Sequence, residues 1–149
     1  MRLSRKPSAV RRRRLFFGCL ALAAVAGVVL ATAHPDTARA FAAQLGFGAL
    51  GESERVRLQL PADLGQPPYD SYLSASRAAG FDFAKFAGRQ VLHVAFCVGR
   101  LGGTDQRIYL NIYLSGRRVV GAFLTGAEAG EAATPINAPG LMIEPLSDD

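Results

Sequence analysis

The sequence has few of the residues that build metal centres and disulfides, with two histidines and two cysteines in 149 residues. A metal site needs three or four converging ligands, and His34 and His93 lie far apart in the chain, so we expect no metal. Cys19 lies in an apolar run and Cys97 in a later segment, so we do not expect them to pair. The stability of the fold should therefore depend on packing.

The sequence also lacks the short motifs that carry common chemistries. The glycines between Gly99 and Gly103 are not followed by a Lys-Ser/Thr pair and a helix, as a phosphate-binding loop requires. No serine lies in a nucleophile elbow. Acidic neighbours such as Glu52 with Glu54 are expected at the solvated surface. We therefore predict no catalytic residue and no cofactor.

His93 and Cys97 are the one pair that invites an enzymatic interpretation, because a reactive thiolate needs a neighbouring base. Four residues along a strand span about 13 Å, which is far beyond hydrogen-bond reach. The β-branched, alternating pattern of Val91 to Val98 favours a strand. We therefore expect Cys97 to be a small buried hydrophobe and His93 to be partly exposed, and a thiol enzyme or redox protein using Cys97 stays the alternative.

Basic charge is concentrated at one end of the chain. Of the 17 basic residues, seven lie before residue 15, at Arg2, Arg5, Lys6 and Arg11 to Arg14. The rest of the chain has ten basic and 12 acidic residues, so it carries no excess of positive charge. A nucleic-acid-binding protein, in contrast, carries its basic excess on the folded domain. This distribution argues against nucleic acid as a partner. It follows the rule that basic residues flank the cytoplasmic end of a membrane segment.

An apolar run follows the basic tail. Leu15 to Ala33 contains no charged residue, and at about 1.5 Å per helical residue it reaches roughly 28 Å, close to the hydrocarbon thickness of a bilayer. We predict a basic cytoplasmic tail at 1–14 that can also touch anionic headgroups, and a single transmembrane anchor at 15–33. The rest of the chain would lie outside the cytoplasm, on a bacterial cytoplasmic membrane.

A basic tail, an apolar run and small residues also describe a secretory signal peptide. Ala38-Arg39-Ala40 and Ala31-Thr32-Ala33 both fit the cleavage pattern, and Arg13-Arg14 resembles a twin-arginine export signal. The apolar run is longer than the usual 7–15 residues of such a signal, which favours an uncleaved anchor. A lipid attached at Cys19 is disfavoured because few apolar residues precede it. Cleavage near Ala40 would instead release a secreted domain.

Beyond the membrane segment the pattern predicts an α+β domain at 49–126. We expect a juxtamembrane helix at 34–48, acting as a stalk, and a flexible tail at 127–149. The domain should hold a half-buried strand at Glu52 to Leu60, a helix at Tyr69 to Ala79 and a short turn at Phe83 to Ala87. Three more strands are expected at Val91 to Val98, Arg107 to Leu114 and Val119 to Leu124. Short connections predict an antiparallel sheet of about four strands with one main packing helix.

Alternation divides the sheet into an aliphatic face and a polar-aromatic face. The polar-aromatic face would carry His93, Cys97, Tyr109, Asn111 and Tyr113. We expect the helix at Tyr69 to Ala79 to pack on the aliphatic face and to leave the other face open. Tyrosines on an open face suit protein or glycan contacts, so His93, Tyr109, Asn111 and Tyr113 form a candidate interaction face.

Several short motifs resemble a bacterial domain of unknown function. They are Tyr69 and Tyr72, Gly80-Phe81-Asp82, Phe86 to Arg89, Gly116 to Gly121 and Leu45 to Gly48. The resemblance covers Phe41 to Gly126, and it implies a small protein with one N-terminal membrane segment and an exported domain. The carboxy-terminal part of that family is more hydrophobic than 126–149 here. The matching residues are turn and packing residues, so the resemblance implies no catalytic residue.

Together these patterns predict a membrane-anchored, non-catalytic extracytoplasmic domain. Its partners would be the bilayer, through Leu15 to Ala33, and a protein or wall component of the cell envelope. Two alternatives stay open, namely the thiol enzyme using Cys97 and a cleaved, secreted domain that binds a ligand.

Overall fold

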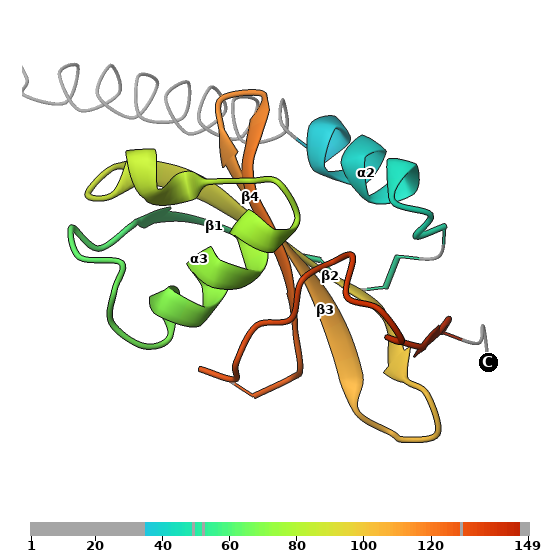
Figure 1. Ribbon diagram of the computed structural model, residues 1–149. Helices are drawn as coiled ribbons and strands as arrows, with labels where there is room; N and C mark the ends of the chain where they lie inside the picture. Colours follow the sequence, from blue (N-terminus) through green and yellow to red (C-terminus); the bar gives the residue numbers. More distant parts are fainter. Residues whose placement is uncertain (1–34, 49, 52, 129, 147–149) are drawn as a thin grey trace, which may run out of the picture. The chain divides into compact units, whose positions relative to one another are not determined.

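The computed structural model of the chain describes residues 35–48, 50–51, 53–128 and 130–146 (Figure 1). Apart from Pro35, these residues belong to one unit that extends over Asp36–Asp149. In this part of the chain no helix combines the length and the hydropathy needed to cross a membrane. The predicted tail at 1–14 and the predicted anchor at 15–33 lie outside the described residues.

The central element is a twisted antiparallel sheet with the strand order β1-β2-β3-β4, to which the short β5 adds by pairing with β2. The strands are β1 (Ser53–Gln59), β2 (Gln90–Leu101), β3 (Arg107–Ser115), β4 (Arg118–Thr125) and β5 (Ile143–Glu144). The predicted α+β class and antiparallel sheet are therefore confirmed, and the four main strands lie within two residues of their expected starts. Alternating β-branched and polar residues explain why these segments pair.

Two glycines set the geometry at opposite ends of the sheet. Gly116 opens the two-residue turn between β3 and β4 with φ +60°, which fits the glycine that a type II′ hairpin turn requires at this position. Gly99 has φ +155° and follows a bulge in β2. A Cβ built there would clash with the carbonyl oxygen of Glu144, so the missing side chain lets β5 approach β2.

The main helix, α3 (Tyr69–Ala78), ends where the sequence predicts. The amide of Gly80 bonds to the carbonyl of Arg77, and the amide of Phe81 bonds to that of Ser76, which is a Schellman motif with Gly80 at φ +89°. The predicted short turn forms as the 3-10 helix η2 (Phe83–Phe86). Asp82 caps it by accepting a hydrogen bond from the amide of Ala84 at 3.0 Å.

The expected position of α3 on the aliphatic face is wrong. The ring of Tyr72 stacks on Phe123 with a centroid distance of 4.6 Å, and Phe123 lies opposite Asn111 on the polar-aromatic face. Phe83 of η2 meets Tyr113 edge to face at 5.1 Å on the same side. The aromatic residues of α3 and η2 are thus matched to the aromatic side of the sheet.

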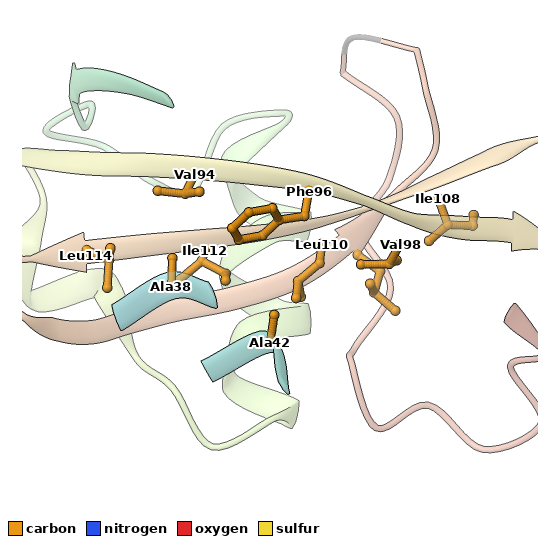
Figure 2. Packing of buried hydrophobic residues seen from close by; sticks show 10 residues of the cluster. Ala38, Ala42, Val94, Phe96, Val98, Ile108, Leu110, Ile112 and Leu114 are labelled. Carbon is orange, nitrogen blue, oxygen red and sulfur yellow. The ribbon is translucent and has the colours of Figure 1, made fainter. Parts of the chain in front are cut away.

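The aliphatic face is covered by α2 (Pro35–Gln44) instead. Ala38 and Ala42 are 0% exposed, and they face the leucines and isoleucines of β3 (Figure 2). Their small side chains at i and i+4 let the helix lie close to the sheet. The prediction of a separate stalk at 34–48 is therefore wrong, because α2 completes the hydrophobic core. The domain begins with this helix and not at residue 49.

The predicted boundary at residue 126 is also wrong for the described residues that follow it. Thr134 forms a bridge with Leu124, and β5 pairs with Arg100 and Leu101 of β2. Three apolar side chains of this segment pack against the aliphatic core, namely Ile136, Leu141 and Ile143. The segment thus belongs to the domain, because it covers apolar surface that the sheet and α2 leave uncovered.

The two outer edges of the sheet differ. The edge of β4 is covered, since the amide of Ala122 donates to Ser76 Oγ of α3 and the amide of Leu124 donates to the carbonyl of Thr134. The edge strand β1 is exposed, and 42% of the surface of Val56 is accessible to solvent. The prediction that this strand is half-buried is therefore wrong. Charged residues such as Arg55 and Arg57 protect such an edge from pairing with other chains.

Candidate functional site

Polar side chains form a hydrogen-bonded row across three strands on the α3 side of the sheet. His93 Nε2 lies 2.9 Å from Asn111 Oδ1, and Asn111 Nδ2 donates to Thr125 Oγ1 at 3.0 Å. The same amide nitrogen also donates to the carbonyl of Tyr109 at 3.2 Å. Asn111 is only 7% exposed, and these bonds satisfy a polar side chain that would otherwise be costly to bury.

This network fixes the tautomer of His93. Because the amide nitrogen of Asn111 donates to two oxygens, the oxygen of the amide must be the atom that faces His93. Nε2 of the imidazole therefore carries the proton and donates it. Burial lowers the pKa of His93, while the hydrogen bond to Asn111 and the charge of Glu54 act in the opposite direction. The ring is thus neutral near pH 7, and its Nδ1 is an acceptor.

The four residues of the predicted interaction face share one side of the sheet, but α3 and η2 cover part of it. Tyr113 is 2% exposed and lies between the rings of Phe83, Phe123 and His93, at centroid distances of 5.1, 5.4 and 5.3 Å. Burial raises the pKa of Tyr113. This tyrosine belongs to the core and has no surface to offer a partner. The expectation of an open face is wrong at this position.

The other three residues line a pocket of about 400 Å³ beyond the cover of α3. We call it the His93 pocket. Its lining from the strands and α3 comprises Glu54, Tyr72, His93, Ala95, Tyr109, Asn111 and Thr125, and the loop after β4 adds Gly126, Ala127, Glu128 and Gly130. The hydrogen-bonded row thus borders a cavity, with tyrosine rings in its wall and two carboxylates in its lining.

The sequence pattern did not identify four of the polar and aromatic residues in this lining. Thr125 follows the expected strand at Val119 to Leu124, and its place beside Asn111 required the register of β3 and β4. Tyr72 was expected in the helix stripe, but on the other face of the sheet. Glu54 lines the pocket because β1 pairs with β2, and Glu128 lines it because the loop after β4 passes beside it. Alternation along β1 is the one signal that points Glu54 to the same face as His93.

Cys97 shares this face of β2 but lies apart from His93. It is 3% exposed, and its thiol contacts the carbonyl of Gly99 at 3.9 Å. The two residues occupy one strand, so their separation follows the roughly 13 Å rise of four strand residues. The prediction that Cys97 is a buried hydrophobe on a strand is confirmed, whereas Cys19 lies outside the described residues. In the part of the chain with described coordinates, no three His, Cys, Asp or Glu side chains gather as a metal site would need.

The His93 pocket provides hydrogen-bond acceptors, aromatic walls and negative charge. His93, whose Nδ1 is an acceptor, lies in the lining, together with Tyr72, Tyr109 and the carboxylates of Glu54 and Glu128. Such a combination suits a group that is positively charged and partly apolar. No protein-family model matches the chain, and no curated protein or solved structure shows significant similarity to it.

Proposed function

We propose that the protein is a single-pass membrane protein with its N-terminus in the cytoplasm, and that its α+β domain binds an envelope component outside the cytoplasm without catalysing a reaction. Membrane anchoring is supported by the uncharged run from Leu15 to Ala33 behind a basic tail. The resemblance to a domain of unknown function stays a prediction and agrees with this topology.

The position of α2 bears on whether the N-terminal segment is removed. Cleavage after Ala40 would cut α2 (Pro35–Gln44) in its middle and remove Ala38, which is 0% exposed in the core. Loss of a fully packed helical turn would destabilise the domain. Cleavage after Ala33 would leave α2 whole. The core position of α2 thus argues against the more distal cleavage site and supports an anchor or a cut at residue 33.

The observation that carries the binding role is the polar row of His93, Asn111 and Thr125 beside a cavity of about 400 Å³. A buried polar network contributes little net stability compared with apolar packing. Here one member of the row, His93, keeps an acceptor nitrogen for which the described residues provide no hydrogen-bond donor. A row that ends beside a pocket of this size suits recognition of a ligand.

The charges of the pocket indicate the ligand class. Its acidic side chains are Glu54 and Glu128, and its aromatic residues are Tyr72 and Tyr109, while burial keeps His93 neutral. Carboxylates and tyrosine faces together attract a cation with an aliphatic stem. The proposed ligand is therefore a primary amine or guanidinium group carried by an envelope protein or wall peptide.

The test is site-specific photocrosslinking of the full chain in its native membrane. A photoreactive residue at Tyr109 should capture a discrete partner, whereas one at Arg57, on the exposed edge strand outside the pocket, should not. Charge neutralisation by Glu54→Gln with Glu128→Gln should reduce capture several-fold. The matched control, Asp105→Asn with Glu144→Gln, removes the same two charges outside the pocket and should leave capture unchanged. Equal capture by both positions, or no effect of the paired neutralisation, would contradict the proposal.

The alternatives lead to different observations. A chain that starts at Phe41 in mass spectrometry of the mature protein, or that leaves the membrane on carbonate washing, would support the secreted domain. The thiol enzyme has no supporting observation in the described residues, because Cys97 is 3% exposed and has no base beside it.

A further inference from the structure

Cationic side chains gather at the end of the sheet where the β3–β4 hairpin turns. Arg117 lies in the turn and Arg118 begins β4, paired with Ser115. Lys85 of η2 and Arg89, just before β2, lie beside Arg118 because all three line one hollow. We call these four residues, Lys85, Arg89, Arg117 and Arg118, the basic end.

Within the described part of the chain, no ion pair neutralises the basic end. The two ion pairs found there join Arg77 to Asp82 at 3.2 Å and Arg100 to Asp105 at 3.7 Å. Asp82 also lines the hollow, but its carboxylate is already held by Arg77 and by the amide of Ala84. Three exposed cations therefore share one hollow, and Arg117 adjoins Arg118 in the turn. The one acidic neighbour, Asp82, is thus bound by partners of its own and is also attracted by Lys85.

The hollow at the basic end has the size and the chemistry of an anion site. Its volume is about 340 Å³, and apolar side chains such as Phe86 and Val120 lie among the cations. A guanidinium group binds a phosphate oxygen pair with two parallel hydrogen bonds, and a lysine adds a point charge. The combination suits a phosphate group attached to an apolar or polar stem.

The chain enters the domain at this same end. A second hollow runs along α2 from Thr37 to Gln44, and Arg117 and Val119 of the hairpin line it as well, so α2 passes beside the hairpin. Figure 2 shows Ala38 beside Ile112, on the side of Leu114, whereas Ala42 lies closer to Leu110, and Leu114 is the residue of β3 just before Ser115 and the hairpin turn. The C-terminal side of α2 continues to Phe47, which borders a hollow with Val98 at the other end. Thus α2 begins at the basic end and runs away from it.

Only four residues separate Ala33, the end of the predicted anchor, from the buried Ala38. Even a fully extended link of this length spans at most about 18 Å. An anchor at 15–33 would therefore hold the basic end close to the membrane surface. Anionic headgroups act over a Debye length of about 10 Å at 0.1 M salt, so cations held at the membrane surface would be attracted to them.

We propose that the basic end docks on the phosphate headgroups of the bilayer that holds the anchor, with a lipid phosphate in the hollow between Lys85, Arg89 and Arg118. This inference rests on the proposed membrane anchoring. The His93 pocket lies near the start of β3 and the end of β4, at the end of these strands that is opposite to the hairpin. When the basic end docks on the bilayer, this pocket therefore faces away from it. The separation of basic and acidic residues thus orients the domain on the membrane. Its basic end contacts the headgroups, and the His93 pocket with its two glutamates is directed toward a partner.

The experiment uses the full chain reconstituted in vesicles of neutral phosphatidylcholine, alone or with about 30 mol% phosphatidylglycerol. A fluorophore on Ser115→Cys reports the hairpin, and one on Asp105→Cys reports the opposite end; both carry Cys19→Ser, and the buried Cys97 is not labelled. Lipids with a quencher on the headgroup measure proximity. We expect quenching at residue 115 to rise at least about threefold on anionic vesicles and to fall back in about 0.5 M salt. Quenching at residue 105 should stay low throughout.

Two matched variants separate the basic end from overall charge. The first replaces Lys85, Arg89, Arg117 and Arg118 by glutamine. The second makes the same change in charge elsewhere, at the exposed Arg55, Arg57, Arg100 and Arg107. The first should lose the anionic enhancement and the second should keep most of it, while unchanged far-ultraviolet circular dichroism shows that both variants fold.

The outcomes distinguish this inference from the function on which it rests. A chain that does not float with neutral vesicles contradicts the membrane anchoring itself. A chain that floats, but shows equal quenching at residue 115 on neutral and anionic vesicles, contradicts the docking alone. Equal losses in the two charge variants would contradict a role for the basic end.

Discussion

The link between α3 and β4 depends on one hydroxyl group. Ser76 is 0% exposed, and its Oγ accepts a hydrogen bond from the amide of Ala122 at 3.1 Å. Ala122 is also 0% exposed and lies on the outer edge of the sheet, where no strand of the described residues pairs with that amide. We predict that Ser76→Ala destabilises the domain although it removes only one atom other than hydrogen.

The magnitude follows from the amide that is left without a partner. A buried donor without an acceptor costs about 1–3 kcal/mol, and alanine returns at most about 0.5 kcal/mol through its higher helix propensity. Water cannot replace the hydroxyl, because this site is crowded: a Cβ built on Gly121 would lie 3.3 Å from Ser76 Oγ and 2.7 Å from Phe83 Cδ1. The expected net loss in the free energy of unfolding is about 0.5–2.5 kcal/mol.

The assay is thermal unfolding of the detergent-solubilised full chain, followed by the near-ultraviolet circular dichroism of its tyrosines. At roughly 4 °C per kcal/mol for a domain of about this size, Ser76→Ala should lower Tm by roughly 2–10 °C. The control is Ser74→Ala, because Ser74 lies on the same helix and is exposed. If both variants melt within about 1 °C of each other, the contact of Ser76 with Ala122 does not support the fold as argued.

Three further predictions concern single side chains. Gly121→Ala should cost about 1–3 kcal/mol, because its Cβ would lie 2.7 Å from Phe83 Cδ1. Gly48→Ala, where the described residues place no atom within 4 Å of the new Cβ, should leave Tm nearly unchanged. Burial lowers the pKa of His93 below its ordinary 6.5, so the unfolded chain binds that proton more readily and Tm should fall as the pH drops from about 7 to about 5. The Tm of His93→Gln should fall less over the same pH interval, and an equal fall in Tm would show that protonation of His93 is not the cause. In a Cys19→Ser background, Cys97 at 3% exposure should react with a maleimide only after denaturant is added, and rapid labelling of the folded chain would revive the thiol enzyme.

Local sequence patterns predicted most of the individual elements. The helix at Tyr69 to Ala79 and the short turn at Phe83 to Ala87 follow from residue chemistry that acts over a few positions, and the structure shows that Gly80 ends the helix and Asp82 caps the turn. The strand alternation also placed His93, Tyr109, Asn111 and Tyr113 on one face of the sheet. Such patterns are reliable because period-2 alternation depends only on the backbone of the strand itself.

The candidate site was predicted only in part, because strand patterns do not show which helices and loops pack beside a strand. Alternation identifies which residues share a face, but the lining of the His93 pocket also needs Tyr72 from a helix and Glu128 from a loop. Neither neighbour can be read from a strand pattern, and both depend on which helix covers which face. The burial of Tyr113 in the core was not predicted either. Phe83 and Phe123 cover its ring, and they come from two separate elements.

The sequence by itself determined the elements, the antiparallel order of its last three main strands and the concentration of basic charge before residue 15. Only the tertiary structure decided that α2 is a core helix and that α3 lies on the aromatic face. Both choices depend on complementarity between surfaces that lie far apart in the chain: Ala38 and Ala42 are small enough to let α2 approach the aliphatic side, and Tyr72 finds its stacking partner in Phe123. Periodicity shows that a helix has an apolar stripe, but the shape and chemistry of the opposing surface select the face on which that stripe packs.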